Sequence, residues 1–177
     1  MSKLARIVSA LAAVAVPIGA LHAAALVITK SQVVVGDSVS VLNPKALPGA
    51  TVDYTLMVDN PNGVLSGNVV GSVVIADVIP ANVRLRVADY GAAGKGPVEF
   101  ADGNLLGLGL LGSGLSLSFK GLGDDTDGID FYDAAGALVH PAPGTEYSAA
   151  VRTIKVTLTG NQAPSTRFRL RFRVSVQ

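Results

Sequence analysis

The chain has 177 residues, of which 49% are hydrophobic, no cysteine, and a formal net charge of +1. The near-neutral charge excludes a general nucleic-acid binder, which carries a clear positive excess. The lack of cysteine excludes disulfides and thiol chemistry, and the length is that of one domain with a core of ordinary size.

Residues 1–25 have the three-part plan of a secretory signal peptide. Two basic residues precede an apolar run over residues 7–21, and small residues at Ala23 and Ala25 follow that run. This pattern predicts export, with cleavage after Ala25. The alternative interpretation is an uncleaved anchor, because a membrane span needs about 20 apolar residues.

Cleavage after Ala25 makes Leu26 the first mature residue and leaves a single domain over residues 26–177. It removes Lys3 and Arg6, which leaves 12 basic and 13 acidic residues and a net charge of −1. We therefore expect a secreted protein of the cell surface or the periplasm, with no membrane span after cleavage and no nucleic-acid partner.

Short runs of alternating or β-branched residues make up most of the remaining chain, with glycine, proline and Asn-Gly turns between them. The runs cover residues 26–36, 50–60, 69–79, 83–90, 115–121, 152–160 and 167–177. Alternation directs two sets of side chains inward: Val52, Tyr54, Leu56 and Val58 in one strand, and Ile154, Val156 and Leu158 in another. Seven or more short strands predict an all-β fold, an immunoglobulin-like antiparallel β-sandwich.

Three stretches carry the resemblance of this chain to a known family. They cover residues 43–63, 73–85 and 170–177, and their matching positions are Asn43, Pro44, Pro48, Gly49, Tyr54, Val73, Val74, Ile75, Asp77, Ile79 and Pro80. The chain resembles the bacterial surface-protein repeat catalogued as domain of unknown function 11. The resemblance implies an immunoglobulin-like sandwich in an exported or cell-surface protein.

Two segments depart from the regular strand pattern. Residues 102–123 are rich in glycine and leucine, and we expect a glycine-rich hairpin or a partly buried loop there. Residues 107–112 match G-x-G-x-x-G, but a dinucleotide site needs a helix after the motif, and none is predicted. Residues 123–133 are expected to form a connecting loop.

The connecting loop carries five aspartates: Asp124, Asp125, Asp127, Asp130 and Asp133. Carboxylate oxygens close together in sequence are the ligands that calcium requires, so calcium is the one cofactor we consider. The spacing is not that of an EF-hand, and a solvated turn is the alternative. His140, the one histidine of the mature chain, has no nucleophile motif to serve, so we expect no enzyme.

The last strand has an arginine at every second position: Arg167, Arg169, Arg171 and Arg173. Alternation directs these side chains to one face, and Phe168, Leu170, Phe172, Val174 and Val176 to the other. Neighbouring arginines lie roughly 6.8 Å apart and repel by about 0.6 kcal/mol in water, so the strand needs no anion to be stable. Arg84 and Arg86 would extend the patch if their strand shares that sheet face.

Two functional hypotheses remain. The first is an exported, non-enzymatic structural or adhesive module of the bacterial cell surface or extracellular matrix. Such a module would contact cell-surface polymers or assemble with itself through strand addition by residues 26–36. The second is a domain that binds an anionic or glycan ligand through the arginine-lined face.

Overall fold

The computed structural model describes residues 24–40, 42–103 and 111–177. The predicted signal peptide therefore lies outside the described residues except for its last two positions, and so does most of the 107–112 string. In the described ranges, no helix is long and apolar enough to cross a membrane.

The regular secondary structure of the described chain is almost entirely β-strand. In chain order the elements are β1 (Val27–Gly36), β2 (Thr51–Asp59), the 3-10 turn η1 (Val64–Ser66), β3 (Val70–Gly71), β4 (Val74–Val78), β5 (Val83–Arg86), β6 (Val98–Asp102), β7 (Leu115–Ser116), β8 (Ile129–Tyr132), β9 (Tyr147–Ser148), β10 (Thr153–Thr157), β11 (Thr159–Gln162) and β12 (Arg167–Val176). The predicted all-β fold class is confirmed.

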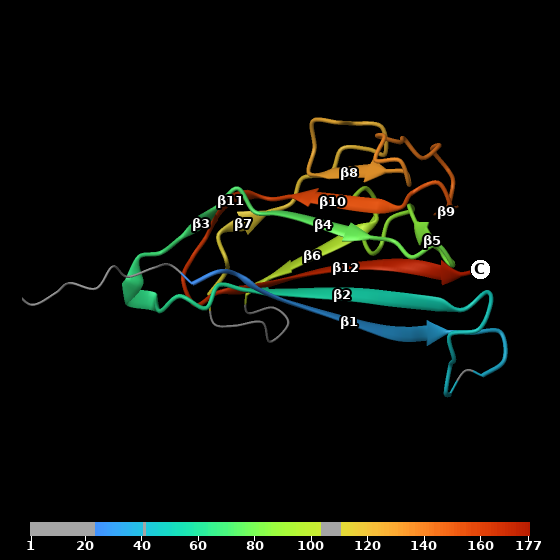
Figure 1. Cartoon of the computed structure of the whole chain (residues 1–177), viewed down its shortest axis with the longest axis horizontal. Coiled ribbons are helices and arrows are strands. Elements are labelled where there is room, and N and C mark those ends of the chain that lie inside the picture. The colour runs from blue at the N-terminus through green and yellow to red at the C-terminus, as the bar shows by residue number, and fades with distance from the viewer. Residues whose placement is uncertain (1–23, 41, 104–110) are drawn as a thin grey trace, which may run out of the picture.

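The strands form two larger antiparallel sheets and one small sheet. The first sheet has the order β1-β2-β12-β5-β9, and β6 also pairs with β12, next to β5 along the same edge. The second has the order β4-β10-β8, and the third has the order β3-β11-β7. Figure 1 shows β8, β10 and β4 above β12, β2 and β1, with the strands of both sheets along the long axis.

The core lies between the two larger sheets and is centred on β12. Its inward side chains Phe168, Leu170, Phe172 and Val174 are at most 2% exposed. Tyr54 of β2 stacks on Phe172 with the ring centroids 5.5 Å apart, and Ile154 of β10 is buried against this layer from the second sheet. The inward faces predicted for residues 52–58, 154–158 and 168–174 are therefore confirmed.

The prediction of a connecting loop over residues 123–133 was wrong at its end. Residues 129–132 form β8, which pairs with β10 and buries Ile129 and Phe131. These two side chains alternate with Asp130 and Tyr132 as in any half-buried strand, but the surrounding aspartates and glycines concealed the pattern. The strand with which β8 pairs, β10, lies in a distant part of the sequence, so local sequence could not predict this pairing.

Candidate functional site

The arginine-lined face of β12 is the first candidate site, and carboxylates line it as well. Across the ladder, Arg167 lies opposite Asp59 and Arg173 opposite Asp53, both on β2. On the other side of β12, Arg171 lies opposite Glu99 of β6. Opposite charges that face each other across a ladder stabilise a sheet, so β12 is not a row of bare cations.

The ion pairs on this face are short. Arg171 donates from Nε and Nη2 to the two oxygens of Glu99, both at 3.0 Å, and Arg169 Nη2 donates to the same carboxylate at 3.0 Å. Arg167 pairs with Asp59. Sequence reasoning treated the arginines as solvated and slightly repulsive, because the strand that carries Glu99 was not predicted.

The most buried pair joins Arg173 and Asp53. Arg173 donates from Nε to Asp53 Oδ1 at 2.6 Å and from Nη2 to Oδ2 at 3.0 Å. The Tyr90 hydroxyl donates to the same Oδ2 at 2.6 Å. The Tyr90 ring also lies 4.7 Å from the guanidinium carbon of Arg171 and 5.2 Å from that of Arg173, within cation-π range.

This cluster shifts the pKa values of its members. Burial alone would raise the pKa of Asp53, but hydrogen bonds from Arg173 and Tyr90 lower it below its ordinary value. Burial, followed by the hydrogen bond to Asp53, raises the pKa of Tyr90 to about 12. Asp53 is therefore ionised and Tyr90 protonated at neutral pH, as their hydrogen bond requires.

The two arginines of β5 lie on the same face. Arg84 is opposite Ser175 in the β5–β12 ladder. Ser175 follows Arg173 by two residues on β12, so Arg84 lies on the same sheet face, next to the end of the arginine row. Its guanidinium carbon is 5.7 Å from the Tyr147 ring. Arg86 donates to Glu146 at 3.3 Å. The structure thus brings all six predicted arginines to one face, together with four carboxylates.

The five aspartates proposed for calcium do not converge. Within the described residues, no three acidic, histidine or cysteine side chains are placed to hold a metal ion. Asp127 accepts hydrogen bonds from the backbone of Lys120 and Ile129, and Asp130 pairs with Lys155 at 2.6 Å. Each of these two carboxylates is thus engaged in its own local contact, Asp127 in a loop cap and Asp130 in an ion pair.

The remaining three members of the set make equally local contacts. Asp124 binds Thr126, and Asp133 accepts from the backbone of Ala135 and Ala137. Asp125 Oδ1 lies 2.7 Å from His140 Nε2, and both side chains are about half exposed. The geometry favours the solvated-turn interpretation of the segment.

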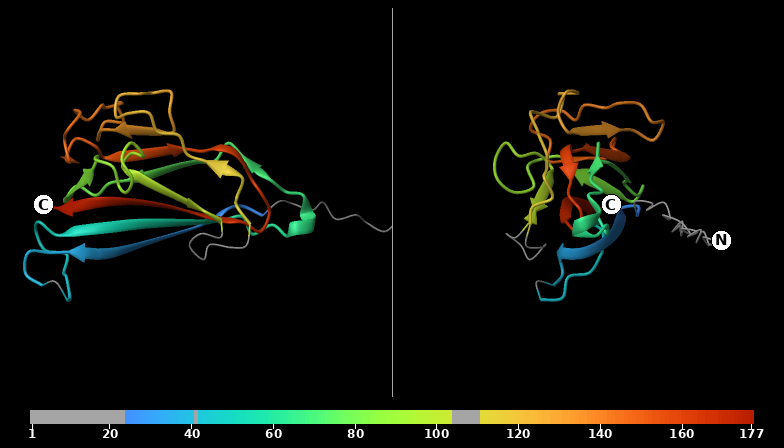
Figure 2. Two further views of the ribbon diagram at one scale, coloured as in Figure 1. Left: turned by 180° about the vertical axis from the view of Figure 1, so that it is seen from behind. Right: turned by 90° about the vertical axis from the view of Figure 1, so that its left-hand side faces the viewer.

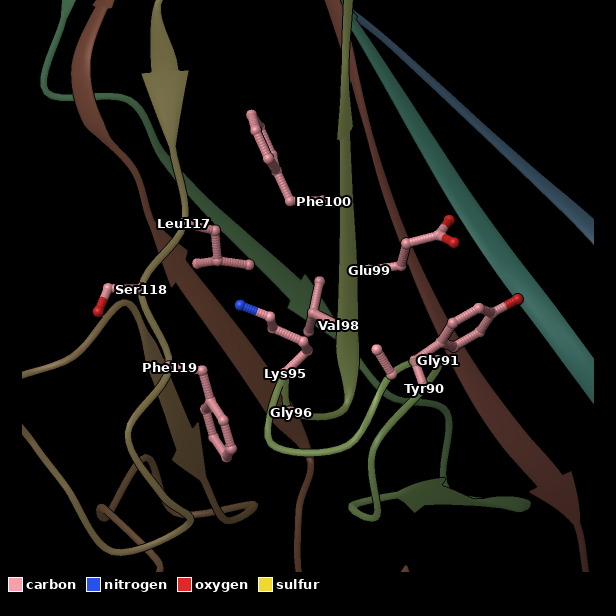
Figure 3. A pocket seen from close by; sticks show the side chains of 11 residues that line it. Tyr90, Gly91, Lys95, Gly96, Val98, Glu99, Phe100, Leu117, Ser118 and Phe119 are labelled. Atoms are coloured by element: carbon pink, nitrogen blue, oxygen red, sulfur yellow. The ribbon is translucent and has the colours of Figure 1, made fainter. Parts of the chain in front are cut away.

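A second candidate site is a hollow of about 570 Å³ between β6 and residues 117–119. Figure 3 shows Phe100 on the β6 side and Phe119 on the opposite side, with Lys95 reaching between the two walls. Sequence reasoning missed this site. Its only signal was two aromatic residues at strand-like positions beside a glycine-rich loop.

The third candidate is the edge strand β1. Among the described strands it pairs only with β2, in register from Val27 opposite Asp59 to Gly36 opposite Thr51. Its exposed apolar side chains are Val27, Ile28, Val33 and Val35, between 44% and 61% exposed. Both views in Figure 2 place β1 at the margin of the molecule.

Two polar contacts hold β1 to the rest of the domain besides the ladder. Lys30 pairs with Asp77 of β4 at 2.6 Å. The side-chain amide of Asn62 binds the backbone of Ala24, accepting from its N–H at 2.8 Å and donating to its carbonyl at 3.0 Å. The strand is thus attached along one edge and near its start, and its other edge has no strand partner in the described chain.

Comparison of the chain with protein-family models, with curated proteins and with solved structures finds no match. The functional argument therefore depends on the three surfaces just described.

Proposed function

We propose that this chain is an exported, non-enzymatic structural or adhesive module of the bacterial cell surface or extracellular matrix. In this proposal, it is an immunoglobulin-like domain that assembles through strand addition by β1. The all-β fold and the signal-peptide pattern support it. The resemblance to the bacterial surface repeat points the same way.

The observation that carries the proposal is the outer edge of β1, with which no other strand of the described residues pairs. Natural edge strands avoid pairing with other chains through charges, prolines, bulges or short length. β1 has ten residues, no proline, and a single charged residue, Lys30, which is neutralised by Asp77. Its only irregularity lies at its end, between Val34 and Gly36.

A strand that adds to this edge gains main-chain hydrogen bonds along its length and apolar contacts on both faces. Val27 and Val33 lie on the outer face of the sheet, opposite Asp59 and Asp53, whereas Ile28 lies on the inner face opposite Val58. Because these side chains are exposed in the single chain, an added strand would bury them, as in other cases of strand addition.

The arginine-lined face is less suited to bind an external anion. Three of the four arginines on β12 share hydrogen bonds of about 3 Å or less with Asp53 or Glu99. An anion would have to displace these carboxylates. We therefore place the anionic or glycan ligand of the second hypothesis below self-assembly through β1.

The proposal is tested on protein purified from the culture supernatant of its host. Intact mass should show a chain that begins at Leu26, and electron microscopy with light scattering should show oligomers or filaments that form as concentration rises. Retention of Met1 would contradict export with cleavage. A protein that stays monomeric at every concentration and salt condition would contradict assembly.

A further inference from the structure

The hollow beside β6 has closed ends. At one end, Gly96 packs on the Phe119 ring so closely that an added Cβ would lie 2.6 Å from Cγ. At the other end, an added Cβ on Gly103 would lie 3.0 Å from the Cα of Gly112. β6 and the segment opposite therefore approach at both ends and separate between them. The space admits a small group or one residue of a polymer, but not a strand laid along β6.

The loop that forms one wall of the hollow is firmly held. The carboxylate of Asp89 accepts hydrogen bonds from the backbone of Gly94 at 2.8 Å and Gly96 at 2.6 Å. The Tyr90 N–H donates to the Gly96 carbonyl at 2.8 Å, and its hydroxyl binds Asp53. Gly96 has φ +79°, a backbone conformation that favours glycine. Because this loop is already ordered, ligand binding costs little additional conformational entropy.

The lining combines aromatic rings with the ammonium group of Lys95. Figure 3 shows the side chains of Glu99 and Tyr90 directed away from the hollow, whereas Lys95 extends into it. In the described part of the chain, the lysines that form ion pairs are Lys30 and Lys155, so the ammonium group of Lys95 is unpaired. Phe100 and Phe119 are each partly exposed.

We propose that this hollow binds an acidic sugar residue, a uronate unit of a polysaccharide. The C–H face of a pyranose ring is apolar and packs on aromatic rings such as the partly exposed Phe100, while the carboxylate pairs with Lys95. The backbone of Gly91 offers polar groups for hydroxyls at the rim. The hollow is open to solvent, so neighbouring sugars of a chain can extend outward. This inference is independent of assembly through β1.

The test is an NMR titration of the isotope-labelled exported protein with trigalacturonate. The neutral methyl ester of trigalacturonate is the matched control. The acid should shift the signals of Lys95 and Phe100 and bind about tenfold more tightly than the ester. Lys95→Gln should weaken acid binding about tenfold, Lys95→Arg should retain it, and added salt should weaken it. Lys45→Gln, a change in the loop after β1, should have no effect.

Three outcomes would overturn the proposal. The first is no binding of the acid by the wild-type protein, and the second is equal binding of acid and ester. The third is binding that shifts the signals of Arg84 and Arg167 instead of Lys95, which would assign the ligand to the arginine-lined face. The titration is run at a concentration at which light scattering shows monomers, so that none of these results depends on assembly.

Discussion

Arg173 and Asp53 face each other across the β12–β2 ladder and share two hydrogen bonds, of 2.6 and 3.0 Å. The residue Asp53 is only 6% exposed, although it lies on the outer face of the sheet, because Arg173 and Tyr90 cover it. A carboxylate in this setting depends on its partners, because an unpaired buried charge is strongly unfavourable.

Arg173→Ala should therefore lower the free energy of unfolding by about 1.5–3 kcal/mol, the range for hydrogen bonds to charged groups. The matched control is Arg167→Ala, since Arg167 pairs with Asp59 at a more exposed position. Exposed ion pairs contribute about 0–1 kcal/mol, so the control should change little. Urea denaturation followed by circular dichroism measures both. Equal effects of the two changes would contradict the special role of the Asp53 cluster.

The same cluster predicts how stability depends on pH. Because the folded-state pKa of Asp53 is lowered, its contribution is present above the unfolded pKa of about 3.9 and is lost as pH falls through the folded value. Because the pKa of Tyr90 is raised to about 12, its contribution is present below the unfolded value and is lost as pH rises toward 12.

Urea midpoints measured across pH test these two expectations. Asp53→Asn should flatten the loss of stability in acid, and Tyr90→Phe should flatten the loss in alkali. The Tyr90 change should also leave the acid limb nearly as steep as in the wild type, because Arg173 still binds Asp53. An unchanged alkaline limb in Tyr90→Phe would contradict the assigned hydrogen bond.

The apolar face of β12 should dominate stability. Phe168 is fully buried and packs on Phe100 with the ring centroids 5.7 Å apart. Phe168→Ala should cost about 3–5 kcal/mol, the range for large aromatic truncations in a core. A differential scanning calorimetry trace close to that of the wild type would show that the face was assigned incorrectly.

The alternation of residues was enough to predict the fold class and the inward faces, but not the pairing of the arginines. Periodicity assigns Phe168 and Arg169 to opposite faces from local sequence alone. The partner Glu99 lies on β6, a strand whose neighbours are glycines and prolines, and register with β12 is a long-range property. The hollow was missed for the same reason, since it arises where β6 and a distant segment separate.

Calcium should leave the melting temperature unchanged at millimolar concentration. The five aspartates of residues 124–133 cap separate turns or pair with Lys155 and His140, so a metal would have to replace those contacts. A ligand selective for the native state raises the melting temperature by mass action. A calcium-dependent rise in the melting temperature would instead establish the calcium site if the double change Asp125→Asn with Asp127→Asn abolished it.

The central claim is that the free edge of β1 drives assembly, and a matched pair of lysine substitutions tests it. Val33 on β1 is 61% exposed, and Val64 on η1 is 65% exposed, so each change adds a charge at a similarly exposed valine. A charge on an edge strand opposes pairing with another chain.

Light scattering and electron microscopy of the two variants beside the wild type give the decisive measurement. Our account predicts that Val33→Lys yields monomers with an unchanged melting temperature, while Val64→Lys assembles like the wild type. Assembly of Val33→Lys at wild-type concentrations would contradict it, and so would equal loss of assembly in both variants.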